Sequence, residues 1–182
     1  RDSTYTMPAK LCAHTGMDAL THCMEAYVST CASMFTDANA LHGIREIVEW
    51  LPKSYAGDHE ARQHMHEAQC IAGIAFSSGL LGIVHSMAHP LGALYDTPHG
   101  VANAIILPTV MEYNAPCTGE KYRDIAKAMG VEGTEKMSQE EYRKAAVDAV
   151  KQLSHDVGIP ANLKDIVKPE DICLLYTSPS PR

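Results

Sequence analysis

The chain has 182 residues, of which 46% are hydrophobic, and a formal net charge of −7. This length suffices for one domain with its own core, and the acidic balance argues against a surface that neutralises the phosphates of DNA or RNA. We therefore expect a small-molecule partner and no nucleic acid.

No run approaches the roughly 18–20 apolar residues that cross a bilayer, and the first residues lack the apolar core of a signal peptide. The six cysteines form no CxxC pair and are expected to be reduced and to pack as small hydrophobic residues. These features predict a cytoplasmic protein with no membrane partner.

Helical periodicity dominates the chain. In chain order, helix is favoured over residues 16–29, then from Leu41 to Leu51, with Thr36-Asp37 as the expected N-cap and Pro52 as the expected end. Segments 58–78, 100–113 and 118–129 follow. The last helix opens at Ser138, where Glu141 completes a capping box, and ends near residues 158–160. Because alternating runs rich in Val, Ile and Thr are nearly absent, the sequence predicts an all-α helical bundle.

The two ends of the sequence differ from its body. The chain begins with Arg1 rather than Met, so we expect it to start within a longer protein. Residues 173–182 form a Ser/Pro-rich run that resembles the translation of a sequencing adapter, and we expect a non-native tail there. Residues 9–172 are predicted to form one domain that is truncated at its C-terminal side.

Two pairs of polar residues have the spacing of neighbours on a helix face. Asp18 and His22 are four residues apart, so both can reach one ion, and His85 and His89 repeat this spacing. Pro90 is expected to end the helix of the second pair, and His99 follows in a turn-like segment.

Each of these pairs also has an ordinary structural interpretation. A histidine pair four residues apart is more often hydrogen-bonded than metal-bound. Asp18 can equally be no more than an acid in the first turn of a helix, where the helix dipole favours it. Buried acids and imidazoles nevertheless need partners, and a metal ion is one such partner. The residues alone leave both interpretations open.

The other histidines carry weaker signals. His59, His64 and His66 lie in a strongly polar stretch that is typical of a solvated helix face. The adjacent pair His155-Asp156 is the one, weak sequence signal for a metal-dependent phosphohydrolase.

Four stretches resemble the signatures of iron-containing alcohol dehydrogenases: residues 7–8, 15–22 (TGMDALTH), 82–93 (GIVHSMAHPLGA) and 98–103 (PHGVAN). Residues 113–126 and 156–160 are most similar to the members that interconvert lactaldehyde and 1,2-propanediol. The resemblance covers most of residues 7–172. It implies the C-terminal helical domain of a dehydroquinate synthase-like fold.

The resemblance also implies a set of site residues. The metal ligands of the family fall on Asp18, His22, His85 and His99, and Fe²⁺ is the usual ion, although the Irving–Williams order makes Zn²⁺ possible. His89 matches a histidine beside the nicotinamide, which gives it a catalytic and cofactor-binding role. Phe76 matches an aromatic residue that narrows the substrate pocket, but it can equally be a core aromatic.

The remaining parts of such an enzyme would lie outside this chain. No Gly-rich phosphate loop follows a strand, so NAD would be bound mainly by an upstream α/β domain, with residues 1–8 as the end of the connection. The resemblance implies an NAD-linked enzyme that interconverts a short alcohol or diol and an aldehyde, and a homodimer at full length. We expect this chain alone to be inactive.

The sequence departs from the family in one place. Where the family commonly has Asn and Gly, this chain has Ser78 and Leu80, one to two helical turns before His85. This difference leaves the substrate open, and a glycerol or butanol dehydrogenase of the iron or zinc type remains an alternative. A catalytically inactive metal-binding helical fragment is another.

Overall fold

The computed structural model describes residues 4–171, and within this range it contains α-helices and 3-10 turns but no β-strand. The all-α prediction is therefore confirmed. The α-helices are α1 (Ala9–Val28), α2 (Met34–Tyr55), α3 (His59–Gly79), α4 (Ile83–Tyr95), α5 (His99–Asn114), α6 (Lys121–Ala128) and α7 (Gln139–Asp156). The short 3-10 segments are η2 (Ala115–Cys117), η3 (Thr134–Lys136) and η4 (Pro169–Asp171).

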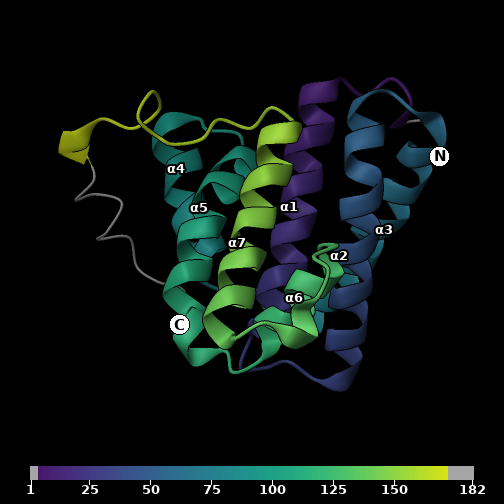
Figure 1. Cartoon of the computed structure of the whole chain (residues 1–182). Coiled ribbons are helices and arrows are strands. Elements are labelled where there is room, and N and C mark those ends of the chain that lie inside the picture. Colours follow the sequence, from purple (N-terminus) through teal and green to yellow (C-terminus); the bar gives the residue numbers. More distant parts are fainter. Residues whose placement is uncertain (1–3, 172–182) are drawn as a thin grey trace.

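Helix α1 is the central element of the bundle (Figure 1). It packs against α2 and α3 on one side and against α5 on the other, while α4 packs mainly on α5 and α6 packs on α7. Its buried side is mostly apolar and includes Met17 and Leu20, which are fully buried. The polar residues of α1 described below therefore lie on a helix that packing holds in place.

Two predicted boundaries of α2 were wrong. The N-cap is Ser33, whose hydroxyl accepts the backbone N–H of Thr36, and the Thr36 hydroxyl accepts the N–H of Ser33 in return. The helix also continues through Pro52 to Tyr55. Proline removes one backbone hydrogen bond, but Leu51 is fully buried beside it, and this packing offsets the loss so close to the helix end.

Pro90 does not end α4, contrary to the prediction. The helix runs on to Tyr95 and ends at Asp96, which adopts the left-handed conformation with φ 52°. Leu91 is almost fully buried next to the proline, so here too burial outweighs the lost hydrogen bond. His99 accordingly begins a new helix rather than lying in a turn.

The predicted capping box of α7 is confirmed. Ser138 accepts the N–H of Glu141, and the Glu141 carboxylate accepts the N–H of Ser138. The helix ends at Asp156, and Gly158 follows with φ +73°, as the Gly–Ile–Pro signal predicts. Local sequence alone is sufficient to define this element.

A sharp break separates α3 from α4. Helix α3 ends at Gly79, Leu80 has φ 66° and ψ 177°, and Gly82 precedes α4. The axes of the two helices are bent by 109° at this point. Ser78 lies in the last turn of α3 and Leu80 in the break, so neither belongs to the helix that carries His85.

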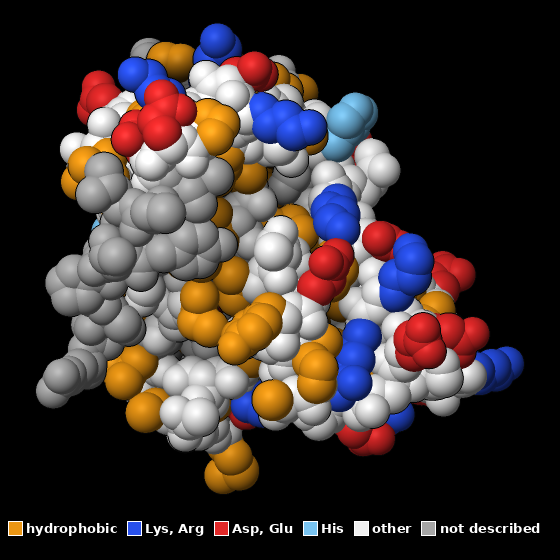
Figure 2. All heavy atoms as spheres, turned by 90° about the vertical axis from the view of Figure 1, so that its left-hand side faces the viewer, with side chains coloured by type: hydrophobic (Ala, Val, Ile, Leu, Met, Phe, Trp, Pro, Cys, Tyr) orange, Lys and Arg blue, Asp and Glu red, His pale blue; other side chains and the backbone are white. Residues whose placement is uncertain are grey.

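In the described part of the chain, no single helix is long and apolar enough to span a membrane. Helices α3 and α4 have the required length and apolar character only when taken together, as a bent pair. Hydrophobic side chains gather on the face shown in Figure 2, which is the side of α4 and α5 in Figure 1. Ile83, Met87 and Leu94 of α4 are among the exposed large hydrophobic residues.

The expectation for the cysteines holds only in part. Cys12 and Cys23 are free and buried, as predicted. Cys31, Cys70 and Cys117 are also free but exposed. Cys173 lies outside the described residues, as does the predicted tail 173–182.

Candidate metal centre

The four predicted ligands come together from three helices. Helix α1 supplies Asp18 and His22, α4 supplies His85 and α5 begins at His99. Asp18 Oδ1 lies 3.6 Å from His85 Nε2 and 3.5 Å from His99 Nε2, and Asp18 Oδ2 lies 3.9 Å from His22 Nδ1. The carboxylate of Asp18 is thus the common neighbour of the three imidazoles.

These separations suit a coordinated ion. A tetrahedral ion with bonds of about 2.1 Å holds its ligand atoms roughly 3.4 Å apart. Asp18, His22 and His85 each offer a ligand atom within 4.8 Å of the others, and within residues 4–171 no other group of His, Cys, Asp and Glu does so. His99 is not a member of this group and is linked to it by the 3.5 Å separation of its Nε2 from Asp18 Oδ1. Three imidazoles and one carboxylate make a borderline donor set that fits Fe²⁺ or Zn²⁺.

Close helix packing brings His99 to this cluster. A Cβ atom added to Gly100 would lie 2.0 Å from the backbone oxygen of His14. Only glycine therefore allows the first turn of α5 to touch α1 at this point. The contact lies beside the turn of α1 that carries Asp18.

Glu25 joins the centre, although the sequence interpretation missed it. Its Oε2 lies 2.6 Å from His85 Nδ1, and its Oε1 accepts the backbone N–H of Val84 at 2.7 Å. The side chain is buried. A signal was present in the sequence, since Asp18, His22 and Glu25 follow one another at steps of four and three residues along one helix face.

Asn103 is a second residue that the sequence interpretation missed. Its amide nitrogen donates to Asp18 Oδ1 at 2.6 Å and lies 3.1 Å from His85 Nε2 and 3.0 Å from His99 Nε2. Its Oδ1 is buried and has no hydrogen-bond partner in the described structure. Its place one turn after His99 was the available signal.

Burial and charge perturb the titration of the cluster. Burial acts to raise the pKa of Asp18, but the close imidazoles of His85 and His22 outweigh it, so the pKa lies below its ordinary value. Burial also acts to lower the pKa of His85, but its bonds to Asp18 and Glu25 raise it to about 9.

The other two imidazoles behave in the opposite way. Burial is the main cause that lowers the pKa of His22, and it likewise lowers the pKa of His99, with His85 adding to the effect. At neutral pH the cluster therefore favours neutral rings at His22 and His99, the form that binds metal.

Phe76 and His89 lie at the edge of the centre. The Phe76 ring stacks on His22, with 4.5 Å between ring centroids. The exposed His89 ring stacks on His99 at 5.4 Å and lies edge-on to His85 at 6.3 Å. Both residues are thus positioned to contact a molecule that approaches the ligands from outside.

The remaining histidines make other contacts. His64 stacks on Trp50 at 3.9 Å and bonds to Glu46 Oε2 at 3.1 Å, and His59 stacks on Tyr5. His155 is exposed, with Nδ1 at 3.5 Å from the adjacent Asp156 carboxylate. None of them belongs to a group with metal-ligand spacing in the described part of the chain.

Comparison with known proteins places this chain in a family. The model of the Fe-containing alcohol dehydrogenase family, C-terminal part, matches residues 12–177. Lactaldehyde reductase of Escherichia coli strain K12 is 56% identical over 167 residues, which are 91% of this chain and 44% of that protein. The NADPH-dependent butanol dehydrogenase of Clostridium saccharobutylicum is 52% identical over 160 residues, 88% of this chain and 40% of that protein.

A solved structure agrees with these matches. The crystal structure of a 1,3-propanediol oxidoreductase superposes with a TM-score of 0.92 at 46% identity, covering 96% of this chain and 46% of that one. The chain thus spans less than half the length of the relatives it matches. It belongs to the iron-containing alcohol dehydrogenase family, of which it represents the C-terminal, helical part.

Proposed function

We propose that this chain supplies the metal site of an NAD-linked dehydrogenase that interconverts a short alcohol or diol and its aldehyde. The convergence of Asp18, His22, His85 and His99 around one carboxylate carries the proposal. The 56% identity to a lactaldehyde reductase supports lactaldehyde and 1,2-propanediol as the substrate pair. The similar identity to a butanol dehydrogenase makes other short alcohols the first alternative.

In this proposal Asp18, His22, His85 and His99 hold Fe²⁺, with Zn²⁺ as the competing ion. The bound ion would act as a Lewis acid on the oxygen of the substrate. Asp18 contributes the negative charge that offsets the ion, and the half-buried position of His99 leaves one side of the cluster open to solvent. The nicotinamide cofactor would come mainly from an upstream domain, in a cytoplasmic homodimer.

Phe76 and His89 would face the substrate and the cofactor. The ring of Phe76 forms an apolar wall against His22, which favours short substrates. The exposed imidazole of His89 can contact the nicotinamide and pass the alcohol proton toward solvent, as imidazoles do near neutral pH. Replacing His89 by alanine should lower turnover or alter its pH profile while metal content is retained.

Metal analysis of the protein that carries this chain tests the site. His85→Ala and His99→Ala should each lose bound iron, measured by elemental analysis and by Zn²⁺ titration calorimetry. His64→Ala is the matched control, because His64 stacks on Trp50 outside the cluster. Retention of the ion by either ligand variant at wild-type affinity would refute the site.

A substrate panel tests the reaction. The wild-type protein should oxidise 1,2-propanediol with NAD at a higher kcat/KM than butanol or glycerol. A preference for butanol with NADP would instead support the first alternative. Metal binding without turnover of any alcohol by the full-length protein would contradict the catalytic proposal and support an inactive metal-binding protein.

A further inference from the structure

Glu25 makes two contacts that the ligand set does not explain. One carboxylate oxygen accepts the backbone N–H of Val84, at the start of α4, and the other lies 2.6 Å from Nδ1 of the His85 ring. Both contacts reach from α1 to a helix that begins about sixty residues later in the chain. Glu25 is therefore a direct polar link between α1 and the first turn of α4, besides the contact of Asp18 with His85.

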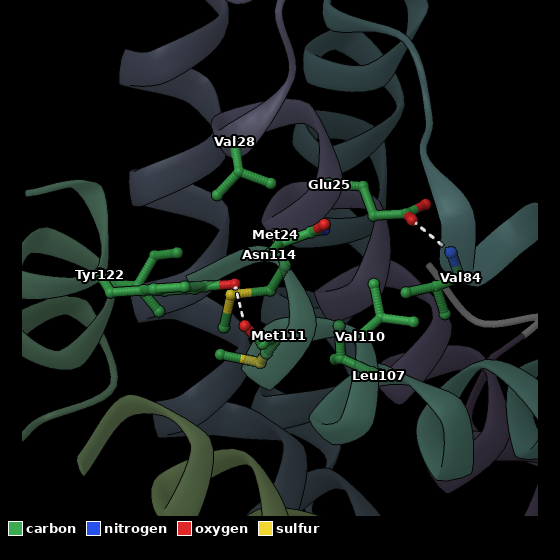
Figure 3. A pocket seen from close by; sticks show the side chains of 10 residues that line it. Met24, Glu25, Val28, Val84, Leu107, Val110, Met111, Asn114 and Tyr122 are labelled. Carbon is green, nitrogen blue, oxygen red and sulfur yellow. Dashed lines mark hydrogen bonds between the residues drawn. The ribbon is translucent and has the colours of Figure 1, made fainter. Parts of the chain in front are cut away.

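The surroundings of Glu25 leave it few other partners. Figure 3 shows its side chain directed toward Val84, above a hollow that is otherwise mostly apolar. This hollow is lined by Met24, Val28, Val84, Leu107, Val110 and Met111, among others. A carboxylate buried in such surroundings needs strong hydrogen bonds, and those to Val84 and His85 meet that need.

We propose that Glu25 is a positioning residue that fixes the tautomer and orientation of His85 for metal binding. A carboxylate only accepts hydrogen bonds, so Nδ1 of His85 must carry a proton and donate its N–H to Glu25. In the neutral ring the lone pair is then on Nε2, the atom that faces Asp18 at 3.6 Å. The inference rests on the proposed metal site, and it adds a residue that shapes the site from behind.

The same carboxylate sets where α4 begins. Gly82 precedes this helix and provides no side-chain cap, so Glu25 takes over this role from another helix. A Cβ atom on Gly82 would lie 2.8 Å from Glu25 Oε1. The Glu25 carboxylate thus fixes both the start of α4, through Val84, and the orientation of the His85 ring.

Glu25→Gln separates these two roles because glutamine has the same shape. Its amide oxygen can still accept the N–H of Val84, but its NH₂ group then faces Nδ1–H of His85. Two donors cannot bond to each other, so His85 is driven to the tautomer with the proton on Nε2, and the nitrogen that faces Asp18 then has no lone pair for a metal. We expect Zn²⁺ affinity to fall roughly 10–100-fold.

The measurements are made on the protein that carries this chain, in wild-type and Glu25→Gln forms. Zn²⁺ affinity is measured by chelator competition, the fold by circular dichroism, and the His85 tautomer by ¹⁵N NMR of the Zn²⁺ form. Glu49→Gln is the control, because Glu49 is an exposed residue of α2 paired with Lys53, and it should leave Zn²⁺ affinity unchanged.

The outcomes separate this inference from the proposed function. If His85→Ala does not weaken Zn²⁺ binding, the metal site itself is wrong. If His85→Ala weakens binding but Glu25→Gln binds Zn²⁺ as tightly as wild type, only the role of Glu25 is refuted. If Glu25→Gln fails to fold, the wild-type NMR spectrum decides, because a Zn²⁺-bound His85 without a proton on Nδ1 overturns the proposal.

Discussion

Replacing Leu80 by glycine and, separately, by alanine isolates the backbone strain at the break between α3 and α4. Leu80 has φ 66° and ψ 177°, a region that is essentially restricted to glycine and costs on the order of 1–3 kcal/mol for other residues. Both variants remove the same half-exposed side chain beyond Cβ. Apart from the Cβ atom itself, the difference between them reports the conformational energy of the backbone in the folded and unfolded states.

The expected sign is unusual. Glycine normally costs roughly 0.5–1 kcal/mol relative to alanine because its unfolded chain is more mobile. Subtracting this cost from the strain leaves Leu80→Gly more stable than Leu80→Ala by about 1 kcal/mol. For a protein of this size that difference raises Tm by roughly 2–4 °C, measurable by urea and thermal unfolding.

A control pair and a refuting result complete the experiment. Gly73 lies inside α3 with no atom within 4 Å of an added Cβ, so Gly73→Ala should stabilise by about 1 kcal/mol. At position 80 the order of glycine and alanine should be reversed. If Leu80→Ala is as stable as Leu80→Gly, the backbone at this break is not strained.

Three further outcomes are expected. Gly100→Ala should destabilise by about 3 kcal/mol or more in urea unfolding and weaken metal binding, because its Cβ meets the backbone of His14; unchanged values would contradict that helix contact. Ser138→Ala should cost about 1 kcal/mol in the same assay, and no loss would rule out a stabilising cap. Because the pKa of His85 is raised in the folded state, protonation of this residue stabilises the metal-free protein. The contribution is complete at a pH below 6.5, the ordinary pKa of histidine, and is lost as the pH rises through about 9. The unfolding free energy should therefore fall over that range in wild type but not in His85→Ala.

Local sequence predicted most of the helical fold. The periodicity of apolar residues and the capping box at Ser138 depend on neighbours in the chain, and the structure contains both. The proline rule failed at Pro52 and Pro90 because the adjacent Leu51 and Leu91 are buried by other helices. Tertiary burial of this kind has no signal in the local pattern.

The ligand cluster could be predicted because its spacing and its resemblance to a family agreed on Asp18, His22, His85 and His99. Glu25 was missed although it follows Asp18 and His22 on one helix face, because its partner His85 lies sixty residues away and a helical glutamate is ordinarily solvated. Leu80 in the left-handed region has no sequence signal either, because the pattern contained glycines at 79 and 82 that account for a turn.

The loose attachment of α4 bears on how an ion reaches the cluster. Helix α4 packs mainly on α5 and exposes Ile83, Met87 and Leu94, whereas α1 is enclosed by three helices. Local opening is drawn from such weakly covered elements, so amide hydrogen exchange should be faster in α4 than in α1. In the proposed metal site, Asp18 and His22 would form a half-site on α1, which His85 and His99 would complete. The order in which the ligands bind the ion would then depend on how stably each helix is packed rather than on how strongly each side chain binds the ion.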